Sequence, residues 1–234
     1  MELKSILQHP ARPDTDRLRD SDRKPLQVLK FTGVAEGQRV LDIYAGGGWY
    51  SELLSRSVGE SGRVYAHNDS LTWRFGRKEM VERTLDNRLP NLIRFDQVEI
   101  KDIPLSPASL DIAFMAINYH DLFFTHRSRN GKYEVMREGI VDPIQAFLHI
   151  RDLLKPDGVL IVIDHAARPG SGYQAANDLH RIDPNIVKYQ LDKVGFTLLE
   201  EAFYLRNPKD DLDALVFDEE IRGKTDRFIY KFGR

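Results

Sequence analysis

The sequence contains no cysteine, which excludes disulfide bonds, thiolate metal ligands and a cysteine nucleophile. It also lacks an excess of charge of one sign, because its net charge is only −2 and no basic field draws it to nucleic acid or anionic lipid. No apolar run approaches the roughly 20 residues that span a bilayer. Residues 1–10 show neither the apolar segment nor the cleavage-like site of a signal peptide. We therefore expect a cytoplasmic protein with no membrane partner.

Length and composition suit one globular domain with a short appendage. The chain has 234 residues, of which 41% are hydrophobic and 30% are charged, enough to bury a substantial core. Residues 10–25 are rich in Arg and Asp and poor in apolar side chains. This composition is typical of a solvated extended arm, or of a lid that orders over a ligand. We therefore divide the chain into an N-terminal arm or lid, residues 1–24, and a main domain, residues 25–234.

Strand-like apolar runs alternate with helical patterns along the main domain. The expected strands cover residues 39–43, 63–67, 92–95, 110–116, 159–163, 196–204 and 227–232. The expected helices cover residues 25–31, 72–85 and 143–154, with others starting at 49 and 184, and residues 155–158 form a turn. This alternation predicts an α/β fold, in which helices cover both faces of a mostly parallel sheet. The last two strands have no helix between them, which indicates an antiparallel pair at one edge.

A glycine-rich turn follows the first expected strand. The strand ends near Asp42, the chain turns through Gly46–Gly48, and a helix begins near Trp49. Glycines let the backbone approach a ligand closely, and the N–H groups at a helix start point toward it. A dinucleotide fingerprint would need a third glycine where this chain has Ser51. That substitution argues against a nicotinamide or flavin site, and a purely structural tight turn is the other interpretation.

The turn resembles the first motif of class I S-adenosylmethionine-dependent methyltransferases, where the glycine loop holds the amino-acid end of the cofactor. The resemblance implies S-adenosylmethionine as cofactor and a Rossmann-like, doubly wound, seven-stranded sheet, mostly parallel with an antiparallel edge strand. The chain departs from the family pattern at Tyr44, which replaces the first glycine. It departs again at Asn68, which is followed by Asp69 and replaces the ribose-binding acid. Glu99 would meet the adenine amino group, with Ile100 against the ring, although an ordinary loop carboxylate is the alternative for Glu99. The implied cofactor-binding residues are Asp42, Tyr44, Gly46, Gly48, Asn68, Glu99, Ile100 and Asn118.

Candidate catalytic residues follow the fourth and fifth expected strands. Residues 118–121 (Asn-Tyr-His-Asp) lie where class I enzymes present the methyl acceptor. The imidazole of His120 could take a proton from a hydroxyl, thiol or amine, with Asp121 or another acid orienting it. His165 follows the neighbouring strand, so both histidines are expected to face one pocket. The candidates are therefore His120, His165 and Tyr119, and ordinary structural or surface histidines are the alternative.

A divalent metal site is a second interpretation of these histidines. His120, His165 and His180, with Asp121 or Asp164, offer ligands that could lower the pKa of an acceptor. Their spacings match no metal motif, and histidines at helix caps or on the surface are the simpler explanation. We therefore predict no metal.

The connection over residues 120–143 is long for a compact domain, and such loops are often lids. We expect Phe123, Phe124 and Tyr133 to shape the acceptor pocket, although a flexible surface insertion is the alternative. Further groups would favour an acceptor with a carboxylate or phosphate if they converge on the pocket: Tyr173, Arg181 and residues 222–226.

Over nearly its full length the chain is similar to a family of bacterial predicted methyltransferases of unassigned substrate. The similarity rests on the glycine loop and on residues 19–20, 24–25, 118–121, 179–183 and 221–226. It implies that residues 25–234 form a methyltransferase domain that methylates a small-molecule O, N or S acceptor, with His120 as general base. The Pro-Pro-aromatic signature of nucleic-acid amino methylation is absent, which argues against DNA, and a homodimer is compatible with the sequence. The alternatives are a non-catalytic cofactor-binding or partner-binding module, motivated by Tyr44 and Asn68, and an RNA methyltransferase if a basic face exists.

Overall fold

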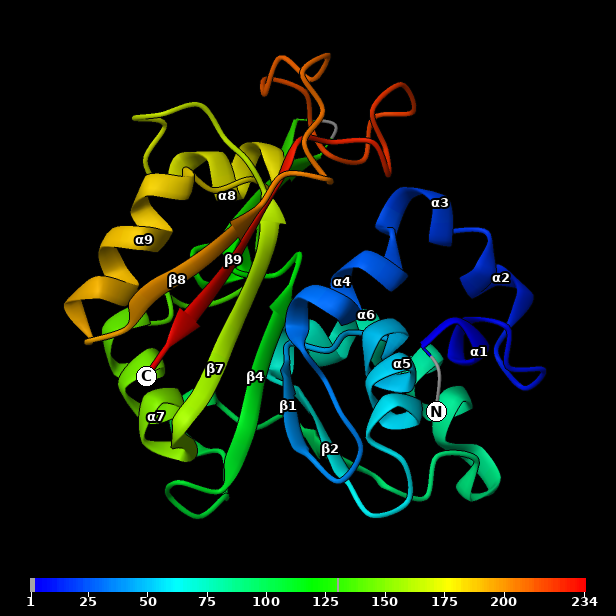
Figure 1. Ribbon diagram of the computed structural model, residues 1–234. Helices are drawn as coiled ribbons and strands as arrows, with labels where there is room; N and C mark the ends of the chain where they lie inside the picture. The colour runs from blue at the N-terminus through cyan, green and yellow to red at the C-terminus, as the bar shows by residue number, and fades with distance from the viewer. Residues whose placement is uncertain (1–2, 130) are drawn as a thin grey trace.

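A single seven-stranded sheet organises the molecule (Figure 1). The computed structural model describes residues 3–129 and 131–234. The strand order is β3-β2-β1-β4-β7-β9-β8; β9 runs antiparallel to both of its neighbours and every other adjacent pair is parallel. The sheet strands are β1 (Arg39–Ile43), β2 (Arg63–Asn68), β3 (Leu92–Asp96), β4 (Leu110–Ala116), β7 (Leu154–His165), β8 (Thr197–Ala202) and β9 (Arg227–Gly233). The predicted Rossmann-like fold is confirmed.

Helices cover both faces of the sheet, with α1, α4, α5 and α6 on one side and α7, α8 and α9 on the other (Figure 1). Each side buries its own apolar cluster: Val28 and Leu53 belong to one, Phe147 and Leu191 to the other. Among the described helices, none has the length and apolar character that crossing a membrane requires. The helices are α1 (Leu3–Leu7), α2 (Asp14–Arg17), α3 (Asp20–Arg23), α4 (Pro25–Thr32), α5 (Trp49–Val58), α6 (Ser70–Thr84), α7 (Pro143–Leu153), α8 (Gln174–Leu179) and α9 (Pro184–Lys193), with short 3-10 turns η1 (Leu85–Asn87), η2 (Ile100–Asp102) and η3 (His120–Leu122).

The predicted elements of the main domain are found with small shifts at their ends. For example, α4 ends at Gly33, whose φ of 76° is the left-handed conformation that glycine adopts without strain. Residues 155–158, predicted as a turn, fall within β7. Leu154 pairs with the first residue of β4 while Val159 pairs with Ile112, so the residues between them leave the ladder as an irregularity.

Residues 10–25 do not form the solvated extended arm that their composition predicted. They include α2 and α3, and Arg12 is only 2% exposed. Arg12 donates hydrogen bonds of 2.7 and 2.5 Å to the carboxylate of Asp20. Asp16 forms an ion pair of 2.7 Å with Arg83 of α6. The charges therefore neutralise one another against the domain; a role for this segment as a lid stays a prediction.

The long connection after η3 contains a two-stranded antiparallel hairpin that the sequence pattern did not predict. Its strands are β5 (His126–Arg129) and β6 (Lys132–Val135), and they form a sheet separate from the main one. Short polar strands of this kind carry little apolar alternation, which is the signal that identifies a half-buried strand.

Candidate active site

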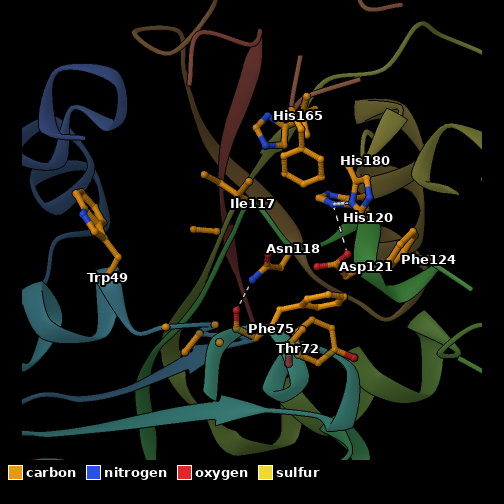
Figure 2. Close-up of a pocket in the computed structure, with 18 of the residues that line it drawn as sticks. Trp49, Thr72, Phe75, Ile117, Asn118, His120, Asp121, Phe124, His165 and His180 are labelled. Carbon is orange, nitrogen blue, oxygen red and sulfur yellow. Dashed lines mark hydrogen bonds and ion pairs between the residues drawn. The ribbon is translucent and has the colours of Figure 1, made fainter. Parts of the chain in front are cut away.

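A cavity of about 920 Å³ lies at the carboxyl ends of β1, β4 and β7 (Figure 2). Open α/β sheets bind their ligands at this edge. The cavity walls come from α3, the glycine loop, the first turns of α6, the residues after β4 and β7, and residues 215–217 and 222–227. One cavity therefore joins the glycine loop to the predicted catalytic histidines.

Two close contacts hold the glycine loop. The Asn68 side chain accepts a hydrogen bond of 2.8 Å from the Gly46 N–H and donates one of 3.2 Å to the Gly46 carbonyl. Helix α6 approaches so closely that a Cβ at Gly76 would lie 2.2 Å from the Gly46 carbonyl carbon. Gly46 itself has a φ of 56° and nothing within 4 Å of where its Cβ would stand. The loop is thus braced from one side and presents bare backbone to the cavity.

Asp42 places a buried carboxyl group on the cavity wall. Its side chain is 2% exposed and accepts a hydrogen bond of 2.6 Å from the Ser51 hydroxyl. Burial raises the pKa of Asp42 to about 7, although the Ser51 hydrogen bond and the charge of Arg23 act in the opposite direction. This carboxyl group is therefore poised to gain a cationic partner.

Tyr44 and Trp49 are buried in the cavity wall and leave its interior open. The Tyr44 ring stacks on His67, with ring centroids 5.5 Å apart. The Trp49 indole N–H donates a hydrogen bond of 3.1 Å to the Asp16 carbonyl. Tyr44 has a φ of 54°, which favours glycine and accounts for the family's glycine at this position. The Asn118 amide donates to the Tyr44 carbonyl (Figure 2), so Asn118 lines the cavity and fixes the loop.

The residues predicted to meet the nucleoside do not line this cavity. Glu99 is exposed, and Ile100 belongs to the apolar core. Asp69 caps the start of α6 and forms an ion pair with Arg137. In the structure, Asn68 therefore braces the glycine loop, and the Asp69 carboxylate is paired with Arg137 of the same chain. Arg137 was not predicted from the sequence, because it stands in the long connection without a motif to mark it.

A cluster of imidazoles and carboxylates forms the other end of the cavity. His120 is 3% exposed, and its Nδ1 lies 2.9 Å from the carboxylate of Asp164, which also accepts a hydrogen bond of 2.8 Å from the His120 backbone N–H. The His120 Nε2 lies 3.3 Å from the Nδ1 of His180 and 3.4 Å from the Oδ1 of Asp121. Asp164 therefore fixes the orientation of the ring and directs Nε2 toward these two groups.

The cluster contains groups with opposite pKa changes. Burial alone would lower the pKa of His120, but the carboxylates of Asp164 and Asp121 raise it to about 9. Burial raises the pKa of Asp121 to about 6. Burial and the neighbouring charge of His120 lower the pKa of His180 to about 3, and the same two causes lower the pKa of His165. At neutral pH a positive imidazole thus stands beside neutral ones.

The structure brings His165 to the cavity but leaves Tyr119 in the core. His165 lines the cavity, with its Nδ1 2.6 Å from the Thr225 hydroxyl and its ring centroid 6.1 Å from that of His120. Tyr119 is fully buried, does not line the cavity, and donates its hydroxyl to Gln190 at 2.7 Å. Tyr119 directly precedes the η3 turn and His120 begins it. Their adjacency in the sequence therefore did not show which of the two side chains faces the cavity.

Aromatic side chains surround the imidazole end. Phe124 and Phe217 lie against His180, with ring centroids 4.4 and 4.9 Å from it. Of the other residues expected to shape the pocket, Phe123 is buried elsewhere and Tyr133 is 67% exposed. Phe217 was not predicted from the sequence, because it comes from a segment without regular structure.

Arginines also line the cavity. Arg23 lies over the Trp49 ring, with its guanidinium carbon 4.6 Å from the ring centroid. Arg222 and Arg227 line the same cavity. Arg181, which was expected to join them, is fully buried in an ion pair with an aspartate and does not line the cavity. Of the groups that the sequence singled out, Arg222 and Gly223 therefore line the cavity, whereas Tyr173 and Arg181 do not.

No protein-family model matches the chain. The ubiquinone/menaquinone biosynthesis C-methyltransferase UbiE of Legionella pneumophila (strain Lens) is 25% identical over 193 residues, which cover 81% of this chain and 68% of that protein. The protein of the same name from Azotobacter vinelandii (strain DJ / ATCC BAA-1303) is 31% identical over 139 residues, covering 58% of this chain and 46% of that protein.

Solved structures share the fold over nearly the whole chain. A SAM-dependent methyltransferase from Aquifex aeolicus aligns with a TM-score of 0.62 and 22% identity, covering 99% of this chain and 98% of that chain. The geranyl diphosphate C-methyltransferase of Streptomyces coelicolor A3(2) aligns with a TM-score of 0.61 and 12% identity, covering 99% and 89%. The fold, the glycine loop and the sequence relatives agree. The chain has the fold of class I methyltransferases, and its sequence relatives support its assignment as an S-adenosylmethionine-dependent methyltransferase.

The methyltransferase offers its cofactor a suitable seat at the methionyl end. The bare backbone at Gly46 faces open space, and Asp42 supplies a buried carboxyl group for an ammonium. The residues present therefore fit the amino-acid part of S-adenosylmethionine. At the nucleoside end, Asn68 and Asp69 are already hydrogen-bonded within the protein, and their contacts with the cofactor stay predictions.

Proposed function

We propose that this methyltransferase methylates a small molecule whose reacting atom lies against the His120 cluster. The observation that carries the proposal is the single cavity that joins the glycine loop to His120, Asp121 and His180. A donor held at one end and an acceptor held at the other would share one space, and holding both in reacting geometry is a large part of catalysis.

Asp42, Gly46 and Asn118 would hold the donor. The Asp42 carboxylate would bind the ammonium of the methionyl group, and the Gly46 backbone would pack against it. Asn118 would keep the loop in place through the Tyr44 carbonyl. When bound, S-adenosylmethionine supplies an electrophilic methyl group.

His120, in its unprotonated form, is our candidate for the group that takes the acceptor's proton. Because the neighbouring carboxylates raise the pKa of His120 to about 9, this form becomes dominant only above about pH 9. An oxygen, nitrogen or sulfur acceptor becomes a better nucleophile when it loses a proton. The curated relatives are named as C-methyltransferases of quinone biosynthesis; methylation of a phenol-type ring at carbon is likewise assisted by loss of the hydroxyl proton. The aromatic side chains beside His180 suit a flat acceptor, so phenols and quinols head the panel of compounds to be assayed.

Calorimetry and a turnover assay test this proposal. S-adenosylhomocysteine should bind to the wild-type protein, and no binding at millimolar concentration would end the proposal. On a metabolite panel, His120→Ala should abolish acceptor-dependent formation of S-adenosylhomocysteine. His149→Gln is the matched control, because His149 lies outside the cavity and makes one hydrogen bond to a backbone carbonyl.

A non-catalytic cofactor-binding module is the second candidate function. It is favoured by the ion pair of Asp69 with Arg137 and by Tyr44 at the family's glycine position. This candidate expects binding of S-adenosylhomocysteine but no acceptor-dependent turnover with any compound. Light scattering tests whether the protein forms the homodimer that is compatible with its sequence, and fractionation tests the predicted cytoplasmic location.

A further inference from the structure

Three ligand-type side chains meet at the imidazole end of the cavity. His120, Asp121 and His180 each offer one nitrogen or oxygen atom, and these atoms lie within 4.8 Å of one another. Two of the separations are shorter, at 3.3 Å between the imidazoles and 3.4 Å between His120 and Asp121. Figure 2 shows the three side chains pointing toward a common position. All three line the cavity, so an ion there would be open to a ligand.

These separations suit the coordination shell of a transition metal. Zinc binds nitrogen and oxygen ligands at about 2.0–2.2 Å, which places neighbouring ligand atoms of a tetrahedral site about 3.3–3.6 Å apart. Two histidines and one carboxylate, with the remaining positions open, are a recurrent metal-binding set. The Asp121 side chain has no other hydrogen bond or ion pair among the described residues, so its oxygen is available as a ligand.

His120, Asp121 and His180 form the ligand triad. Asp164 lies outside this triad and orients its central residue, His120. The Nδ1 of His120 lies 2.9 Å from Asp164, and a carboxylate behind a histidine commonly fixes the nitrogen that binds a metal. His165 is not part of the triad, because its Nδ1 is hydrogen-bonded to Thr225 and its ring lies farther from His120 than the His180 ring does. His165 and His180, which both lie beside His120, are thus distinguished by their hydrogen-bond partners.

We infer that His120, Asp121 and His180 bind one divalent transition-metal ion of the zinc class, with open coordination positions facing the cavity. The prediction of no metal, made from sequence spacing, is thereby revised. The role of the ion rests on the proposed function: an acceptor hydroxyl bound to it would lose its proton more readily. His120 would then act as a ligand, and the removal of the proton would not depend on it as a base.

Cobalt binding tests the site directly. Wild-type protein freed of metal with a chelator should bind one Co²⁺ per chain, with visible absorption bands of a low-coordinate nitrogen and oxygen site. Asp121→Asn and His180→Asn should each weaken this binding at least tenfold, whereas His149→Gln should bind like the wild type. Absence of binding by the wild type, or equal affinity in the triad variants, would overturn the inference and leave a hydrogen bond between the two imidazoles.

Two further measurements separate this inference from the proposed function. Binding of S-adenosylhomocysteine to His180→Asn shows that the variant is folded, so its loss of Co²⁺ is then assigned to the missing ligand. Cobalt binding by a wild-type protein that does not bind S-adenosylhomocysteine supports the metal site and refutes the function. Turnover that is unchanged after metal removal refutes the role of the ion in activating the acceptor.

Discussion

Replacing Asp42 with Asn should stabilise the protein at alkaline pH while weakening cofactor binding. Burial raises the pKa of Asp42 to about 7, against an ordinary value of 3.8. The folded protein therefore holds this proton at pH values where the unfolded chain has lost it, and stability falls as pH rises from about 4 to 7. The two pKa values differ by about 3, which corresponds to about 4 kcal/mol of lost stability above pH 7. Asn has nearly the same size and accepts the Ser51 hydrogen bond, so packing is preserved.

Urea unfolding of both proteins at pH 4.5 and pH 8 measures this effect. The free energy of unfolding of Asp42→Asn relative to the wild type should rise by about 3 kcal/mol between the two pH values. Asp157→Asn, at an exposed position, should show no such pH-dependent difference. Calorimetry at pH 8 should show at least tenfold weaker binding of S-adenosylhomocysteine to Asp42→Asn. If Asp42→Asn and the wild type lose stability in parallel from pH 4.5 to 8, the raised pKa of Asp42 is refuted.

Other predictions concern the buried carboxylate of Glu52, which forms ion pairs with Arg83 and Arg88, and the braces of the glycine loop. Although burial acts against it, hydrogen bonds and charges from neighbouring arginines lower the pKa of Glu52 to about 2. Glu52→Gln should therefore cost about 3 kcal/mol at pH 7 in urea titrations, and the cost should shrink as pH falls from about 4.5 toward 2. Asn68→Asp keeps the acceptor for the Gly46 N–H but loses the donor to its carbonyl, and should cost about 1–3 kcal/mol in thermal unfolding; an unchanged melting temperature would speak against the brace. Gly76→Ala should cost about 1–3 kcal/mol and weaken S-adenosylhomocysteine binding in calorimetry, whereas Glu82→Ala on the exposed side of α6 should change stability by no more than about 0.5 kcal/mol; full binding by Gly76→Ala would contradict the close approach.

Local chemistry made the framework predictable. The strand at residues 110–116 and the helix from Pro25 to the Gly33 stop follow from apolar periodicity and from capping residues, which act over a few positions. The glycine loop was predictable for the same reason. Its conformation depends on residues that have no side chain, and these are identified directly from the sequence. Residues 10–25 were misread because composition shows charge but not pairing, and their arginines and aspartates neutralise one another only in the folded chain.

Tertiary contacts decided the chemistry of the site. The sequence indicated a class I sheet, a glycine loop after Asp42 and histidines after two neighbouring strands. It could not show that Asn68 braces the loop, that Tyr119 faces the core, or that His180 meets His120 from a segment 60 residues away. The reason is physical: backbone propensity is set by near neighbours, whereas the partner and the pKa of a buried polar group depend on elements that meet only after folding.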